Sequence, residues 1–207
     1  MLGVLAEKQR SVPDVYPMTL NALVAGCNQK TSRDPVMDVS DTQAQEALDS
    51  LRSMTLVIES SGGRVLRYEH NIERVLRIPT QSSALLAVLM LRGPQTAGEL
   101  RINCDRLHKF ADISAVEGFL HELAERPAGA LVAELARQPG ARENRWAHLL
   151  CGAPAAEQHA TERPAPARNV DPGEIATLKS RVEALEAAMT ELQAVVDCLR
   201  NGQIPGS

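Results

Sequence analysis

The chain has 207 residues, with 22 Lys and Arg against 26 Asp and Glu, and its formal net charge is −4. This length is enough to bury at least one hydrophobic core. The slightly acidic balance argues against a polybasic coat protein for nucleic acid, which needs a strong positive field. Aromatic residues make up 2% of the chain, which leaves little for stacking on single-stranded bases.

No stretch approaches the roughly 20 apolar residues that a membrane-spanning helix needs, and the N-terminus lacks the basic start of a signal peptide. The four cysteines, Cys27, Cys104, Cys151 and Cys198, form no C-x-x-C pair and have no His at zinc-finger spacing. We therefore expect a cytoplasmic protein with unpaired thiols and with no metal or other cofactor.

The first 152 residues read as two copies of one pattern. The spacing Thr-x3-Leu-x3-Cys occurs at 19–27 and again at 96–104, and an Arg-aromatic-x-His run occurs at 67–70 and again at 145–148. Matches in a fixed order with small changes in spacing indicate a duplicated unit with loop insertions.

Helix ends are well marked in both copies. Capping boxes are expected at Ser40 and Thr96, because each is followed three residues later by Gln or Glu. Gly93-Pro94 should end the helix that begins near Thr80. That helix is apolar on all sides between residues 84 and 91, which predicts burial between domains or subunits.

Each copy should end in an amphipathic third helix and a hairpin. The third helices are expected over 41–54 and 112–126. Strands are expected at 55–59 and 64–70 in the first copy, and at 130–135 and 145–151 in the second. Three helices followed by a two-stranded hairpin are the winged-helix arrangement. The predicted fold is therefore mainly α with small β-hairpins (α+β), with winged-helix domains at 1–78 and 79–152.

The remainder differs in composition. Residues 153–173 contain four prolines and no apolar periodicity, which predicts a disordered linker. Residues 174–200 carry a heptad repeat that favours a parallel two-stranded coiled coil and a homodimer; the alternative is an amphipathic helix that folds back on its own domains. The expected dimerisation residues are Ile175, Leu178, Val182, Leu185, Met189, Leu192, Val196 and Leu199.

No nucleotide-binding or hydrolase motif occurs in the sequence. His70 and His148 end equivalent strands, which favours a structural role for both. Cys27 and Cys104 end equivalent helices with apolar neighbours, which is typical of buried packing. We therefore expect no catalytic residues and no enzymatic activity.

The winged-helix interpretation raises DNA binding, but both third helices are acidic and would be repelled by phosphates. The hairpins are more basic, so a DNA-associated transcriptional regulator that contacts the DNA backbone through them is the first hypothesis. The alternative is a protein–protein adaptor that uses the acidic third helices. In the alternative interpretation of the arginines, they are solvated or paired with local acids. The expected nucleic-acid contacts are Lys30, Arg33, Arg64, Arg67, Arg137, Arg142 and Arg145.

Several runs are specific enough to point to a family. They include Glu-Lys-Gln at 7–9, Cys-Asn-Gln-Lys-Thr-Ser-Arg-Asp-Pro-Val-Met at 27–37 and Leu-Arg-Gly-Pro-Gln-Thr-Ala-Gly-Glu-Leu-Arg at 91–101. In these runs the chain resembles the bacterial YceH family, which consists of uncharacterised proteins of tandem winged-helix fold, often with a short coiled-coil tail. The resemblance implies that fold over nearly all of residues 1–152. It implies no activity or substrate, so no functional residue is carried over.

The chain departs from that family at its start. Relatives usually begin several residues earlier, whereas this sequence opens at Met1-Leu2-Gly3. The first helix is then expected to have barely two turns, which is short for a stable helix. We interpret this as a misassigned start rather than as a missing core helix.

Overall fold

The computed structural model describes residues 1–60, 65–138 and 140–152, together with residues 181 and 189. The described residues up to 152 belong to one compact unit. The predicted linker at 153–173 lies outside the described residues, as does the predicted coil apart from residues 181 and 189.

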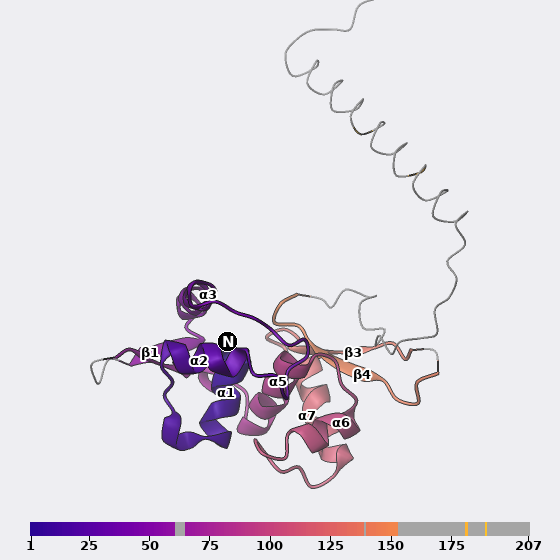
Figure 1. Cartoon of the computed structure of the whole chain (residues 1–207). Helices are drawn as coiled ribbons and strands as arrows, with labels where there is room; N and C mark the ends of the chain where they lie inside the picture. Colours follow the sequence, from indigo (N-terminus) through magenta and orange to yellow (C-terminus); the bar gives the residue numbers. More distant parts are fainter. Residues whose placement is uncertain (61–64, 139, 153–180, 182–188, 190–207) are drawn as a thin grey trace, which may run out of the picture. The chain divides into compact units, whose positions relative to one another are not determined.

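The described part has a mixed α/β fold with seven α-helices, one short 3-10 helix and two small antiparallel hairpins (Figure 1). The elements of the first half are α1 (Leu2–Ser11), η1 (Pro13–Val15), α2 (Leu20–Cys27), α3 (Asp41–Ser53), β1 (Val57–Ser60), β2 (Arg67–His70) and α4 (Ile72–Leu76). Those of the second half are α5 (Thr80–Arg92), α6 (Ala97–Asn103), α7 (Ile113–Ala124), β3 (Val132–Leu135) and β4 (Arg145–His148).

The two halves repeat one arrangement of three helices and a hairpin. Val57 faces His70 across the first hairpin, and Val132 faces His148 at the same place in the second. A further bridge joins each hairpin to the residues just before the second helix of its half, Met18 to Tyr68 and Gln95 to Trp146. These matched pairings support the internal repeat expected from the sequence.

The predicted helix ends are confirmed. At Ser40 and at Thr96 the side-chain oxygen accepts a hydrogen bond from the backbone N–H three residues on, and the Gln43 and Glu99 side chains accept in return. Helix α5 ends at Arg92 because Gly93 takes a positive φ of 70°, which glycine adopts at no steric cost.

Helix α5 lies at the centre of the compact unit. Residues 82–89 of this helix are all buried. The burial predicted for 84–91 is thus confirmed over 84–89, while Met90 and Leu91 are half-buried. It packs against α1 from the first half and against α6, α7 and β4 from the second, and Figure 1 shows α1 and α7 on opposite sides of it. One cluster of buried side chains, including Leu5, Leu48, Leu86 and Leu120, therefore extends through both halves.

Helices α1 and α4 and the short 3-10 helix η1 differ from the prediction. Helix α1 has ten residues, not barely two turns, and Leu2, Val4, Leu5 and Ala6 are buried. Packing on α5 therefore gives α1 the stability that its length alone would not provide.

Helix α4 was not predicted, because five residues are too few for a periodic pattern. It forms because Ile72 enters the core with no exposed surface, and it ends where Arg77 adopts a left-handed φ of 51°. Arg126, just past α7, donates a hydrogen bond to the carbonyl of Leu76 at its end.

Candidate functional site

The hairpin arginines are only partly free. Arg67 is exposed, but its Nη1 donates to the carbonyl of Pro17 at 2.7 Å. Arg137 and Arg142 flank the turn of the second hairpin, and both are exposed. Arg64 lies outside the described residues. The described hairpins thus offer Arg67, Arg137 and Arg142 to a partner.

Arg145 is engaged within the fold. Its Nη1 donates to the carbonyl of Pro94 at 2.7 Å, and its Nη2 lies 3.1 Å from Oε1 of Glu99. Glu99 also closes the capping box of α6, so Arg145 joins β4 to the start of that helix. A local acid therefore pairs with this arginine, although its side chain is still 41% exposed.

Arg33 and Lys30, in the loop before α3, have different environments. Lys30 is exposed, whereas the Arg33 side chain is only 3% exposed. Burial removes Arg33 from the surface that DNA would reach. We therefore leave this residue out of any proposed DNA contact.

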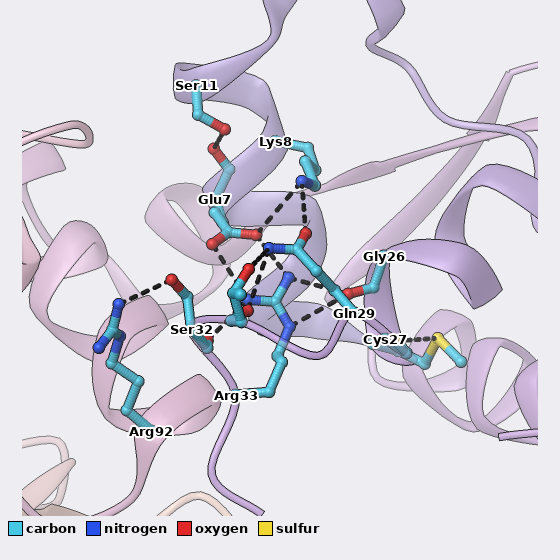
Figure 2. A network of polar contacts seen from close by, with 11 residues as sticks. Glu7, Lys8, Ser11, Gly26, Cys27, Gln29, Ser32, Arg33 and Arg92 are labelled. Carbon is cyan, nitrogen blue, oxygen red and sulfur yellow. Dashed lines mark hydrogen bonds and ion pairs between the residues drawn. The ribbon is translucent and has the colours of Figure 1, made fainter. Parts of the chain in front are cut away.

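The Arg33 guanidinium is the centre of a polar network (Figure 2). Its Nη1 and Nη2 donate to the two carboxylate oxygens of Glu7 on α1, at 3.1 and 2.6 Å. Its Nε and Nη2 also donate to the carbonyl of Gly26 at the end of α2, at 3.1 and 2.8 Å. Because these hydrogen bonds satisfy the buried charge, the network fixes α1, α2 and the following loop together.

The same loop reaches the second half. Arg92, the last residue of α5, donates from Nη2 to Oγ of Ser32 at 2.8 Å, as Figure 2 shows. The backbone N–H of Asp34 donates to the carbonyl of Leu91 at 2.9 Å. The residues that carry this bridge fall within the specific runs at 27–37 and 91–101.

A cleft of about 810 Å³, which we call the junction cleft, opens where the two halves meet beside this network. It combines cations, uncharged polar groups and apolar side chains. Its lining includes Lys8, Arg10, Ser32, Arg92, Ile102 and Arg106.

Most of the charged side chains that helices α3 and α7 expose are carboxylates. Glu46 and Asp49 are exposed on α3, and Glu117 and Glu122 are exposed on α7. Each helix turns its apolar stripe inward, with Leu48 and Leu120 both fully buried. The predicted acidic character of these helices therefore lies on the side that faces solvent.

His70 and His148 occupy equivalent, partly buried places at the ends of β2 and β4. Burial lowers the pKa of both side chains. Nε2 of His70 lies 2.7 Å from Oε1 of Gln9, while Nδ1 of each ring is buried with no hydrogen-bond partner in the described part of the chain. These environments favour the neutral imidazole.

Tyr16 approaches the same hairpin, and its hydroxyl accepts a hydrogen bond from the backbone N–H of His70 at 2.7 Å. Burial raises the pKa of Tyr16 to about 12. The hydroxyl is therefore a fixed neutral partner of β2 at any ordinary pH.

The cysteines behave as packing residues. Cys27 and Cys104 are buried and unpaired, as the sequence predicted, and Cys151 is exposed and unpaired. Burial raises the pKa of Cys104 to about 12, so its thiol stays protonated and unreactive. Within residues 1–60, 65–138 and 140–152, no group of three or more His, Cys, Asp or Glu side chains is placed to hold a metal ion.

In the same ranges no helix has the length and apolarity required to cross a membrane. Of the expected dimerisation residues, only Met189 is described; it is helical and 62% exposed. The others lie outside the described residues: Ile175, Leu178, Val182, Leu185, Leu192, Val196 and Leu199.

The sequence did not predict the junction cleft or the pair of Glu7 and Arg33. The available signal was indirect, because Glu7 and Arg33 both fall within the specific runs at 7–9 and 27–37. Both side chains are largely buried in the structure. The two residues are 26 positions apart, so no short-range spacing in the sequence could indicate that they form a pair.

Comparison with known proteins places these features in a family. The chain is 59% identical over 196 residues to a UPF0502 protein of Dechloromonas aromatica, a match that covers 95% of this chain and 91% of the relative. It is 56% identical over 204 residues to a UPF0502 protein of Acidovorax sp. (strain JS42), covering 96% and 89%. Residues 1–141 match the family described as "Protein of unknown function, DUF480". The chain therefore belongs to the DUF480 family of bacterial proteins, which includes the UPF0502 proteins.

Proposed function

We propose that this protein is a non-enzymatic, tandem winged-helix adaptor, and that α3 and α7 bind basic segments of partner proteins. The observation that supports this most directly is the row of exposed carboxylates on both helices. In a DNA-binding winged helix the third helix enters the major groove and faces a wall of phosphates. Carboxylates at this place oppose DNA and favour a basic protein surface.

The charges on α3 and α7 are sparsely neutralised. On α3, Asp49 is paired with Arg52, but the pair is exposed and weakened by water. On α7, Glu117 and Glu122 make no ion pair with a described residue. Each half thus carries a negative surface at the equivalent position, and both belong to one compact unit.

DNA binding through the hairpins is the second candidate, and the exposure of Arg67, Arg137 and Arg142 favours it. Contacts of this kind would reach phosphates without reading bases. Glu134 and Glu143, exposed on the same hairpin as Arg137 and Arg142, reduce the positive field there. We therefore rank this candidate below the adaptor.

One comparison separates the two candidates. Affinity capture from a bacterial extract uses the full chain, a Glu117→Lys/Glu122→Lys variant on α7 and, as a control, Glu143→Lys on the hairpin. The adaptor predicts a co-purifying protein that is lost with the α7 variant and kept with the control.

Random duplex DNA is then titrated at several salt concentrations, because phosphate contacts make binding fall steeply with salt. Salt-dependent DNA binding that an Arg137→Gln/Arg142→Gln variant abolishes, with no protein lost on α7 substitution, would establish the second candidate instead.

A further inference from the structure

The junction cleft has the size of a ligand site. Its volume of about 810 Å³ falls within the roughly 300–1,000 Å³ of small-molecule sites in proteins. It lies between α1 and the loop after α2 on one side and the ends of α5 and α6 on the other. Both sides belong to the same compact unit, so the cleft is built into the fold.

Positive charge dominates this cleft. Lys8, Arg10, Arg92 and Arg106 line it, against Glu7 and Asp105. The Glu7 carboxylate is bound on both oxygens by the buried Arg33, and the Lys8 ammonium lies 3.8 Å from one of them. Arg10 pairs with Glu73 at 3.2 Å, so Arg92 and Arg106 supply the positive charge of the cleft that no described carboxylate pairs.

Two of the cations retain free donors. The Arg106 side chain is exposed and makes no hydrogen bond or ion pair with the described residues. Arg92 uses Nη2 to hold Ser32, and no other hydrogen bond from its guanidinium is made within the described ranges. Arg92 is partly buried, so its position is fixed while donors remain for an anion.

The cleft also has an apolar side. Ile102, which faces solvent on α6, is 72% exposed and lines the cleft together with Val88, Leu91 and Leu107. No packing within the described residues accounts for this isoleucine. An apolar surface next to unpaired cations matches a ligand with an anionic group and an apolar body.

The backbone at Ser32 supports a binding role. Ser32 has a φ of 60°, an unusual conformation for a residue with a side chain. In this conformation its carbonyl accepts from Arg33 at 2.8 Å and its hydroxyl accepts from Arg92. A strained residue thus positions one of the cations that line the cleft.

We propose that the junction cleft binds a small organic phosphate. The phosphate is held by Arg92 and Arg106, which keep free donors, and the apolar part of the ligand lies against Ile102 and Leu107. Arginine forks match the paired oxygens of a phosphate and give directional binding. The cleft lining includes no residue of α3 or α7. This proposal therefore does not depend on the proposed adaptor function.

Calorimetric titration of the full chain tests this proposal with three probes: AMP, adenosine and inorganic phosphate. AMP is expected to bind, adenosine to bind at least about tenfold more weakly because it lacks the charged hydrogen bonds, and phosphate to bind more weakly than AMP because it lacks the apolar contact. Absence of AMP binding up to millimolar concentration, or equal binding of adenosine, would overturn the proposal.

Two variants locate the binding. Arg106→Gln is expected to weaken AMP about tenfold, while Lys109→Gln, an equal loss of charge at an exposed residue outside the cleft lining, leaves affinity unchanged. Ile102→Ser should weaken AMP but not inorganic phosphate. Ile102 and Arg106 are both exposed, so their variants should keep the melting temperature of the wild type, which shows that the fold is intact. Equal effects of the Arg106 and Lys109 variants would contradict a site in the cleft.

Discussion

Glu7 and Arg33, 26 residues apart in the sequence, are joined by two parallel hydrogen bonds of 2.6 and 3.1 Å between carboxylate and guanidinium. The Glu7 side chain is 14% exposed and that of Arg33 is 3% exposed. Removing one partner of such a pair leaves the other charge buried without compensation. The pair therefore belongs to the framework of the fold rather than to its binding surface.

Arg33→Gln is expected to lower the free energy of unfolding by about 3–5 kcal/mol. It removes both short hydrogen bonds to the Glu7 carboxylate and leaves it only the Lys8 ammonium, at 3.8 Å. Arg33→Lys should fall between this variant and the wild type, since lysine keeps the charge but not the paired geometry. Urea unfolding measures both. Asp49→Asn is the control, because it breaks an exposed pair that contributes at most about 1 kcal/mol. A cost for Arg33→Gln as small as that of the control would contradict the structural role.

Gly26→Ala is expected to destabilise the protein by about 1–3 kcal/mol. A Cβ at this position would lie 2.7 Å from Cγ1 of Val4, so α1 and α2 would have to separate. Gly118→Ala is the matched control, because a Cβ there meets nothing within 4 Å and alanine favours a helix interior by about 1 kcal/mol. Thermal melts should therefore shift in opposite directions, and a stabilised Gly26→Ala variant would show that α1 and α2 pack less closely than described.

Stability should decline as the pH falls below about 6.5, because His70 and His148 have lowered pKa values in the folded state. Between the folded and unfolded pKa values the unfolded chain binds more protons, so acid favours unfolding. The contribution of the two histidines to stability is complete above their pKa in the unfolded chain, about 6.5. It is lost as the pH falls through their lower pKa values in the folded protein. The dependence of the urea midpoint on pH should become weaker in a His70→Gln/His148→Gln variant, and an unchanged dependence would contradict the assignment to these two histidines.

Deletion of residues 173–207 should convert a dimer into a monomer, since the heptad positions of the sequence favour a two-stranded coil. Light scattering of the two purified chains gives their masses directly. Leu185→Lys, a charge at a predicted d position, should have the same effect without shortening the chain. An unchanged mass after the deletion would rule out this coil as the dimerisation element.

Local features of the fold were predictable from the sequence, because they depend on neighbouring residues. The Ser40 and Thr96 caps and the end of α5 at Gly93 each follow from a few adjacent side chains. The burial of α5 was also predictable, because a helix with no polar face has no side to leave in water.

The candidate site was not predictable in the same way. A basic residue in a loop is usually solvated, and only the folded chain reveals that α1 brings a carboxylate to Arg33. The junction cleft likewise depends on α1, α5 and α6 meeting in space. The sequence placed Arg33 among surface contacts because charge patterning carries no information about such long-range partners.

The central position of α5 sets an order for synthesis on the ribosome. Helix α1 emerges before α5, against which it packs, and α5 is complete only when Arg92 has left the exit tunnel. Until then Leu2 and Leu5 lack this partner and present apolar surface to the cell. The first half therefore cannot finish its core alone, and the nascent chain is expected to need shielding until the start of the second half has emerged.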